Sequence, residues 1–213
     1  TEWKIIDTPA FQRLRKLKQL QMGYLVYPNA THTRFAHSLG VLKVMQRILE
    51  HVRASREDKE DLCLAALMHD IGHYPYSHLL EGVDKVILTE ERIDSTQKSA
   101  LSEFTPYPDH EDVGREILLH QSDLLRIIGG RERAERIGNI FARTAAANQQ
   151  LSKLIHSSLD MDRLDYLIRD SQATGVPYGM VDIHYLLNHV KQSPSGTIGI
   201  THKAVAAAEH LLL

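Results

Sequence analysis

Residues 67–78 concentrate side chains that can bind a metal ion. They bring together His69, Asp70, His73 and His78, beside Gly72 and Pro75. Neutral imidazole and carboxylate are common ligands of divalent transition metals. A His-Asp pair alone also fits an ordinary buried helix end, where the histidine only forms a hydrogen bond. The two nearby histidines favour a metal site over that alternative.

Two other segments carry candidate ligands. His37 follows Arg34 by three residues in a predicted helix, and this pair suits a site joining a metal to a phosphate, because arginine offers phosphate a planar fork of donors. A helical histidine is otherwise most often a packed or surface residue. The second segment contains four aspartates: Asp160, Asp162, Asp165 and Asp170. Asp162 and Asp165 share a helix face with Arg169. Spacing does not decide which aspartates point inward, and a solvated acidic face is the alternative.

Length and composition predict one globular domain. The chain has 213 residues, of which 43% are hydrophobic and 24% charged, and its net charge of −2 gives no nucleic-acid signal. The lone Cys63 excludes an internal disulfide and suits a reducing compartment. Without a signal peptide or a long uncharged apolar segment, we expect a cytoplasmic protein that has no membrane partner. The missing initiator Met and a helix still in progress at residues 204–213 suggest truncation at both ends.

Hydrophobic periodicity predicts that helices position these residues. The expected helices cover residues 9–20, 31–53, 58–68, 124–128, 131–143, 151–170, 181–190 and 204–213, and another opens at His110 behind a candidate cap, Asp109. The helix at 131–143 shows only a weak face for burial. Residues 24–27 suggest a short extended segment, 83–109 an insertion with some helix, and 190–192 with 197–201 a hairpin. The predicted fold class is therefore all-α, with a small β-hairpin near residues 190–202.

Together these segments resemble the HD-domain metal-dependent phosphohydrolases over nearly the whole chain. The resemblance is carried by four ordered blocks: residues 32–40, 69–78, 110–111 and 160–166. With residues 6–9 and 18–20, they look like the deoxynucleoside triphosphate triphosphohydrolase branch, which includes the vertebrate sterile-alpha-motif and HD-domain enzyme and bacterial relatives. The resemblance implies a single HD domain over residues 1–213, folded as a helical bundle.

The resemblance also implies a role for each matching residue. The implied metal ligands are His37, His69, Asp70 and Asp162. The implied substrate-binding residues are Arg34 and Arg163 at the phosphates, Tyr166 near phosphate or sugar, and Gln19 and Asp170 near the sugar 3′-hydroxyl. The implied catalytic group is His73, His78 and His110, one of which protonates the leaving oxygen, with Glu81 and Glu111. Glu81 stands where the vertebrate enzyme has an aspartate beside its catalytic histidine.

The implied activity is hydrolysis of a dNTP to deoxynucleoside and triphosphate, through attack of a metal-activated water on the α-phosphorus. The implied ion is Mn, Fe, Ni or Zn, with Mg as a second ion on the phosphates. The implied partners are a nucleotide substrate and further copies of the chain in a homo-oligomer. Two alternatives stay open: a nucleotidase or phosphodiesterase on the same metal site, and a non-catalytic nucleotide-binding or oligomer-forming module.

Overall fold

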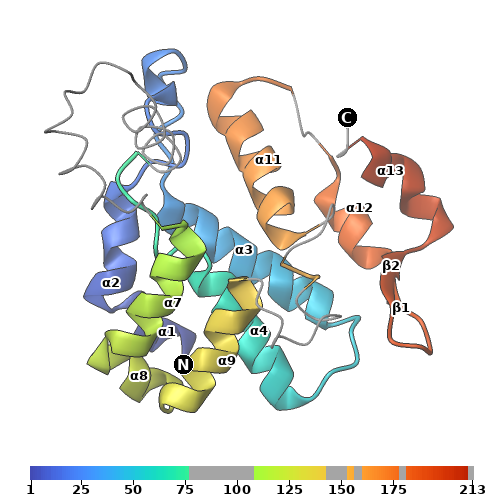
Figure 1. Cartoon of the computed structure of the whole chain (residues 1–213). Helices are drawn as coiled ribbons and strands as arrows, with labels where there is room; N and C mark the ends of the chain where they lie inside the picture. Colours follow the sequence, from blue (N-terminus) through green and yellow to red (C-terminus); the bar gives the residue numbers. More distant parts are fainter. Residues whose placement is uncertain (77–107, 143–152, 156–159, 178–180, 211–213) are drawn as a thin grey trace, which may run out of the picture.

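The computed structural model describes residues 1–76, 108–142, 153–155, 160–177 and 181–210, which form a helical fold with a small hairpin (Figure 1). The described α-helices are α1 (Glu2–Ile6), α2 (Pro9–Gln12), α3 (Arg34–Leu49), α4 (Arg56–Met68), α7 (His110–His120), α8 (Ser122–Ile128), α9 (Arg131–Phe141), α11 (Met161–Thr174), α12 (Ile183–Asn188) and α13 (Val205–Glu209). Short 3-10 helices are η1 (Arg13–Lys16), η2 (Gly23–Leu25) and η3 (His202–Ala204). The strands are β1 (Val190–Gln192) and β2 (Ile198–Ile200). The predicted all-α class with a hairpin is confirmed.

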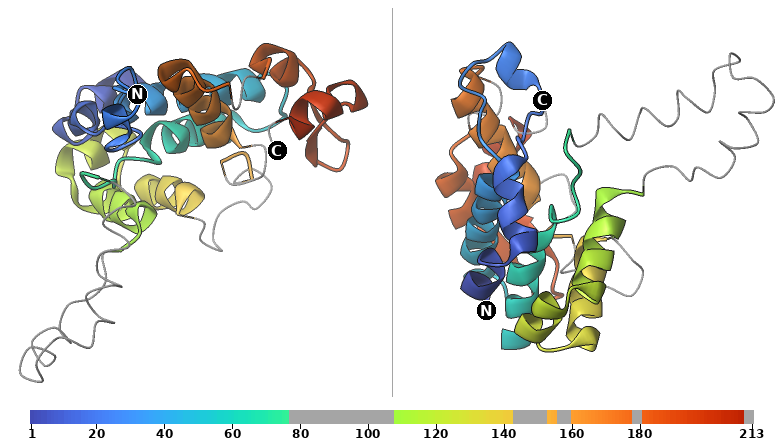
Figure 2. Two further views of the ribbon diagram at one scale, coloured as in Figure 1. Left: turned by 90° about the horizontal axis from the view of Figure 1, so that it is seen from above. Right: turned by 90° about the vertical axis from the view of Figure 1, so that its left-hand side faces the viewer.

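The long helix α3 lies at the centre of the fold (Figures 1 and 2). It packs against α4 on one side and α11 on another, while α4 and α7 both pack against α9. Buried side chains such as Met45 on α3, Leu64 and Leu67 on α4 and Phe141 on α9 belong to one hydrophobic cluster. Burial of this apolar surface holds the helices together. Helices from distant parts of the sequence therefore share one core.

Side-chain caps set the start of three of these helices. The Thr33 hydroxyl accepts a hydrogen bond from the backbone N–H of Ala36 at the start of α3, and Ser55 accepts one from Asp58 at the start of α4. The Asp160 carboxylate accepts from the N–H of Arg163 at the start of α11. Each cap satisfies a backbone donor that the first helical turn leaves without an intrahelical partner. These caps place the candidate ligands of α3 and α11 in or next to the first turn.

Several predicted boundaries were right in kind and approximate in place. The hairpin pairs Val190 with Ile200 in antiparallel register, as expected. Asp109 precedes α7, but its side chain makes no capping hydrogen bond. The prediction that residues 131–143 have a weak burial face was wrong, because α9 buries Ala134, Ile137, Gly138 and Phe141. Small residues at two of these positions hid that face from hydrophobic periodicity.

The predicted helix over residues 9–20 was wrong in length. Helix α2 ends at Gln12, and after η1 the chain pairs with the segment before α3: Lys18 forms a β-bridge with Thr33, and the carbonyl of Leu17 accepts from the N–H of Arg34. This long-range pairing overrides the helical periodicity. The expected extended segment at residues 24–27 was also wrong, since η2 coils through Gly23–Leu25.

Other predicted helices are shorter than expected. Helix α3 ends at Leu49 rather than near residue 53, and α11 begins only at Met161, after its Asp160 cap. The expected insertion at residues 83–109 lies outside the described residues apart from its last two. Among the helices of the described ranges, none has both the length and the apolar character needed to span a membrane.

Candidate metal centre

Helix α4 delivers two of the predicted ligands at its C-terminal end. Residues Leu62–Met68 are buried, and the helix ends where His69 and Asp70 follow them, 7% and 3% exposed. The Nδ1–H of His69 donates to the carbonyl of Ala66 at 2.9 Å. That bond fixes the tautomer of the ring, so its Nε2 carries the lone pair. His69 Nε2 lies 3.4 Å from Asp70 Oδ1.

Helix α3 contributes His37, whose side chain is completely buried. Its Nδ1 lies 2.8 Å from Asp165 Oδ2 on α11, which places the ring proton on that nitrogen. The Nε2 atom then faces Asp162 Oδ1 at 2.8 Å and Asp70 Oδ2 at 3.8 Å. His37 is therefore aimed between two carboxylates by a third carboxylate on its other side.

Asp162 in the first turn of α11 completes the group. Its Oδ1 lies 3.7 Å from His69 Nε2 as well as beside His37 Nε2. The ligand atoms of His37, His69 and Asp70 all lie within 4.8 Å of one another. The Nε2 atoms of His37 and His69 are buried and make no hydrogen bond with the described residues. Two such imidazole lone pairs facing two carboxylates fit a divalent cation, and this donor set suits Mn, Fe, Ni or Zn.

The pKa shifts show how the carboxylates act on the two histidines. Burial opposes a positive charge on His37, but the carboxylates of Asp162, Asp165 and Asp70 outweigh burial and raise its pKa to about 9. His69 is also buried, and Asp70 and Asp162 raise its pKa by the same route. Burial raises the pKa of Asp162 less than the two imidazoles lower it, so the net shift is downward. These carboxylates thus favour positive charge at the histidines, and a bound cation would take the place of those protons.

Arg34 and His73 flank Asp70 on its other sides. The Nη1 of Arg34 donates to Asp70 Oδ2 at 2.7 Å, and His73 Nε2 lies 3.1 Å from Asp70 Oδ1. Burial opposes the Asp70 charge, but His69, Arg34 and His73 hold the pKa of that carboxyl well below its usual range. Burial lowers the pKa of His73 to about 4 despite the Asp70 charge. His73 is therefore a neutral imidazole at pH 7.

His73 stacks on His110 from the first turn of α7, with ring centroids 3.7 Å apart. His110 Nδ1 lies 3.5 Å from Glu111 Oε2. A Cβ on Gly72 would overlap the carbonyl of His110 and the backbone of Gly114, so the turn after α4 packs directly on α7. Asp70, His73 and His110 form a second group whose ligand atoms lie within 4.8 Å. The stack depends on a glycine that lets two backbones meet.

A cavity of about 290 Å³ opens beside these groups. Its lining residues are Arg34, His69, Asp70, His73, His110, Glu111, Phe141, Ile155, Asp160 and Asp162. It is close to the lower end of small-molecule sites. Basic and acidic side chains dominate its wall, so the cavity suits a polar, anionic ligand held with a cation.

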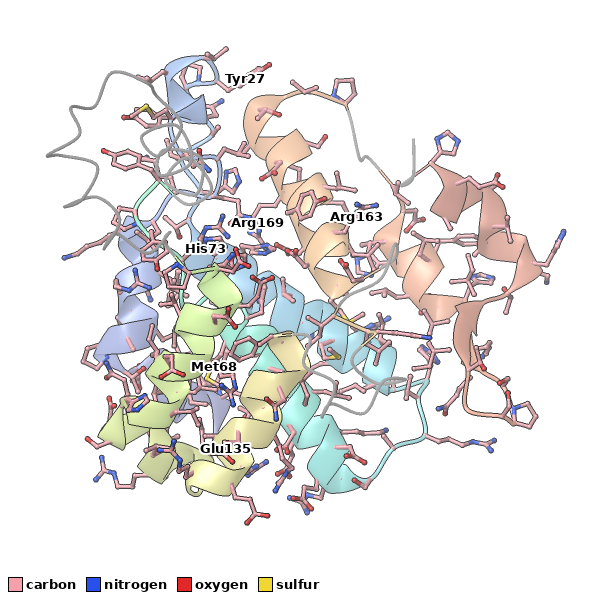
Figure 3. All side chains as sticks on the ribbon, in the orientation of Figure 1. Tyr27, Met68, His73, Glu135, Arg163 and Arg169 are labelled. Carbon is pink, nitrogen blue, oxygen red and sulfur yellow. The ribbon has the colours of Figure 1, made fainter. Side chains whose placement is uncertain are left out.

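Other predicted site residues lie outside this lining as far as the described residues show. The side chain of Asp170 contacts His32, with Oδ1 2.6 Å from Nε2, whereas Gln19 meets the same residue through its backbone, whose N–H donates to the His32 carbonyl. Arg163 and Tyr166 lie on α11 and do not line the cavity; in Figure 3 Arg163 is farther from His73 than Arg169 is. Their predicted roles stay predictions. His78 and Glu81 lie outside the described residues.

The sequence did not predict the roles of three residues, Asp165, Arg169 and Arg13. Asp165 binds His37, and Arg169 binds Asp165 through two hydrogen bonds. Arg13 donates to the carbonyls of His73 and Ile71 at 2.7 and 2.6 Å and holds the turn after α4. The spacing of Asp162, Asp165 and Arg169 signalled a shared face without a role for each residue. No local pattern signals Arg13, because its partners lie about sixty residues away.

The comparisons with known proteins agree with this geometry. The model of the HD domain family matches residues 34–170. An uncharacterised protein of Methanocaldococcus jannaschii is 36% identical over 215 residues, covering 100% of this chain and 40% of that protein. The human deoxynucleoside triphosphate triphosphohydrolase SAMHD1 is 46% identical over 87 residues, covering 37% of this chain and 14% of the enzyme. The crystal structure of a phosphohydrolase from Bacteroides thetaiotaomicron superposes with a TM-score of 0.78 at 28% identity, covering 99% of this chain and 47% of that one. The chain thus spans less than half the length of each of these relatives.

Proposed function

Because the chain belongs to the HD domain family, we propose that its buried cluster is the catalytic centre of a metal-dependent phosphohydrolase acting on dNTPs. The observation that carries the proposal is the convergence of His37, His69, Asp70 and Asp162. In this group two imidazole Nε2 atoms face carboxylates and make no hydrogen bond within the described ranges. In such a site a divalent ion supplies polarisation of a phosphoryl oxygen and activation of water.

Arg34 supports a phosphate as the ligand of the cavity. Its side chain is buried and anchored by Asp70 at 2.7 Å, and it lines the cavity wall. A guanidinium presents several N–H donors in a fixed fork that matches phosphate oxygens. In the proposed site its charge would offset the negative charge that accumulates on a phosphoryl group in the transition state. Arg34 therefore has the placement expected of a residue that binds and stabilises that group.

The stacked histidines support a proton donor near the leaving oxygen. The His110 side chain is 16% exposed and lines the cavity, whereas that of His73 is only 2% exposed. Burial lowers the pKa of His110, and the negative charge of a bound phosphate would raise it again. We assign the proton to His110 and a supporting role to His73, which lies between His110 and Asp70.

The choice of a dNTP rests on the likeness to the human triphosphohydrolase and on the group around His32. The Asp170 carboxylate contacts the His32 ring, the backbone N–H of Gln19 donates to the His32 carbonyl, and Gln19 Oε1 is buried without a hydrogen bond to the described residues. A carboxylate and an amide side chain are suited to hydrogen-bond a sugar hydroxyl. The proposed products are deoxynucleoside and triphosphate. A homo-oligomer, which the resemblance implies, stays a prediction that light scattering of the purified protein would test.

A substrate panel tests this function. The full-length protein would be stripped with chelator, reloaded with Mn, Fe, Ni or Zn, and incubated with dNTPs, ribonucleoside triphosphates, mononucleotides and cyclic nucleotides. We expect triphosphate release from at least one dNTP, and none from the His69→Ala variant. Turnover of only mononucleotides or cyclic nucleotides would replace the dNTP assignment with a nucleotidase or phosphodiesterase. Metal binding without turnover of any member would contradict the proposal.

A further inference from the structure

We propose that Asp165 and Arg169 are positioning residues that hold His37 in its metal-binding orientation, and that Gly40 makes room for them. The inference rests on the proposed function in one respect, that the cluster binds a cation. It assigns an outer layer to the site, one that touches neither the ion nor the substrate. These residues join α3, which supplies His37, to α11, which supplies Asp162.

Both oxygens of the Asp165 carboxylate make contacts on the Nδ1 side of His37, away from the proposed cation position. Its Oδ2 lies 2.8 Å from His37 Nδ1 and accepts from Arg169 Nε at 2.8 Å, while its Oδ1 accepts from Arg169 Nη2 at 2.7 Å. A carboxylate that accepts a hydrogen bond from a metal-binding histidine fixes the tautomer and orientation of the ring and makes its other nitrogen a stronger electron-pair donor to the metal. His37 depends on this contact more than His69 does, because His69 is oriented by a carbonyl of its own helix.

Arg169 explains why Asp162 and Asp165 take different roles despite their shared helix face. Both carboxylates lie within 2.8 Å of a nitrogen of His37, Asp162 at Nε2 and Asp165 at Nδ1. The two-pronged contact from Arg169 keeps Asp165 on the Nδ1 side and neutralises its charge there. Asp162 has no such contact from Arg169 in the described structure and is left to face the cation. In Figure 3 Arg169 lies on the side of α11 toward His73.

Gly40 is the steric counterpart of this pair. It lies on α3 one turn after His37, and a Cβ built there would overlap the carboxylate of Asp165 and the guanidinium of Arg169. The pair therefore rests against the bare backbone of α3. An alanine at this position would push Asp165 away from His37 while leaving every proposed ligand in the sequence.

The test measures metal affinity and geometry rather than turnover. Free Mn²⁺ would be followed by electron paramagnetic resonance during titration, and the visible absorption of bound Co²⁺ would report ligand geometry. We expect Asp165→Ala to weaken Mn²⁺ binding roughly 10–100-fold and to alter the Co²⁺ spectrum. Asp165→Asn, whose amide oxygen can still accept from Nδ1–H, should fall between Asp165→Ala and the unchanged protein. Arg169→Gln and Gly40→Ala should weaken binding in the same direction.

Two variants serve as matched controls. Asp61→Asn removes the charge of another buried aspartate that binds arginines, between α4 and α9. Gly138→Ala adds a methyl group within α9, where the three nearest atoms to the new Cβ all belong to the side chain of Arg115. Both should leave Mn²⁺ affinity within about twofold. Thermal unfolding in chelator identifies variants that are folded, and if Asp165→Ala is not, Asp165→Asn and Arg169→Gln decide the question.

The outcomes separate this inference from the proposed function. An unchanged protein that binds no Mn²⁺ or Co²⁺ would overturn the metal site and this inference with it. An unchanged protein that binds metal, together with folded Asp165 and Arg169 variants of equal affinity and identical Co²⁺ spectra, would overturn only the positioning role. Loss of affinity in the Asp165 series with retention in Asp61→Asn would support it.

Discussion

Besides Asp70, the described structure has two buried aspartates that bind arginine, Asp61 and Asp165, and their contacts differ. Asp61 on α4 accepts from Arg133 at 2.6 Å and Arg136 at 3.3 Å, both on α9. Asp165 on α11 accepts from Arg169 of its own helix and also contacts His37. The Asp61 contact joins α4 to α9 within the core. It lies about two helical turns, roughly 12 Å along α4, before the candidate metal ligand His69. The Asp165 contact reaches the candidate metal ligands through the imidazole of His37.

The difference teaches that a buried carboxylate and its arginine do not by themselves mark a functional site. Burial and ion pairing are shared by both aspartates, 4% and 9% exposed. What distinguishes Asp165 is that one of its oxygens faces a histidine whose other nitrogen has no hydrogen bond to the part of the chain that the structure describes.

Removing a ligand should have the largest effect on metal binding. His69→Ala deletes one imidazole from the cluster, so we expect the affinity loss to exceed the 10–100-fold typical of outer-shell changes, with turnover abolished. Calorimetric titration with Mn²⁺ measures the affinity. Retention of tight binding by a folded His69→Ala protein would show that the ion lies elsewhere.

The two aspartates should separate stability from metal binding. Asp61→Asn leaves Arg133 without its buried charge partner, so we expect a loss of about 2 kcal/mol in the free energy of unfolding, less than for a fully buried pair since the Arg133 side chain is 22% exposed. Urea unfolding in chelator measures that loss. If Asp61→Asn weakened Mn²⁺ binding as much as Asp165→Asn does, the two regions would not be distinct.

The free energy of unfolding in chelator and the metal affinity should both follow the titration of His37. Although burial opposes it, the surrounding carboxylates raise the pKa of His37 to about 9, above its value near 6.5 in the unfolded chain. In chelator this group stabilises the fold fully below pH 6.5, and that contribution is lost as the pH rises toward 9. Metal affinity should rise over the same interval, because protons compete less with the ion. Urea unfolding and Mn²⁺ titration from pH 6 to 9 check both slopes. Because the pKa of His69 is raised as well, part of each slope should remain in a folded His37→Ala protein, and slopes that are unchanged there would contradict this assignment.

An exposed ion pair provides the smallest effect and a baseline. Glu135, labelled in Figure 3, pairs with Arg131 at 3.3 Å on the surface of α9, where both side chains are well exposed. Glu135→Gln should change the free energy of unfolding by less than about 1 kcal/mol and leave metal affinity unchanged. A larger loss in urea unfolding would mean that the contrast between Asp61 and surface pairs is overstated.

Local patterns predicted the fold where local physics decides it. The hairpin at residues 190–200 and the helix that ends at His69 follow from turn residues and an apolar run, and both are confirmed. The expected helix over residues 9–20 failed because Lys18 pairs with Thr33 across a long stretch of chain. The burial of α9 was missed because its packing face uses Ala134 and Gly138.

The candidate site divides in the same way. His69 and Asp70 stand out because they adjoin other histidines in the sequence. Asp162 and Asp165 are equivalent by spacing, and only the resemblance favoured Asp162 as the ligand. The structure shows that Arg169 binds Asp165, and in the proposed site this contact leaves Asp162 to face the cation. Long-range contacts such as that of Arg13 with the turn after α4 leave no local pattern to read.

Anomalous diffraction from crystals of the full-length protein grown with Mn²⁺ would show whether one cation binds to His37, His69, Asp70 and Asp162 together. The account predicts a peak at the manganese edge within about 2.3 Å of His37 Nε2, His69 Nε2 and one oxygen each of Asp70 and Asp162. A manganese peak that excludes His37 or Asp162, or crystals at saturating metal with no peak between α3, α4 and α11, would contradict it.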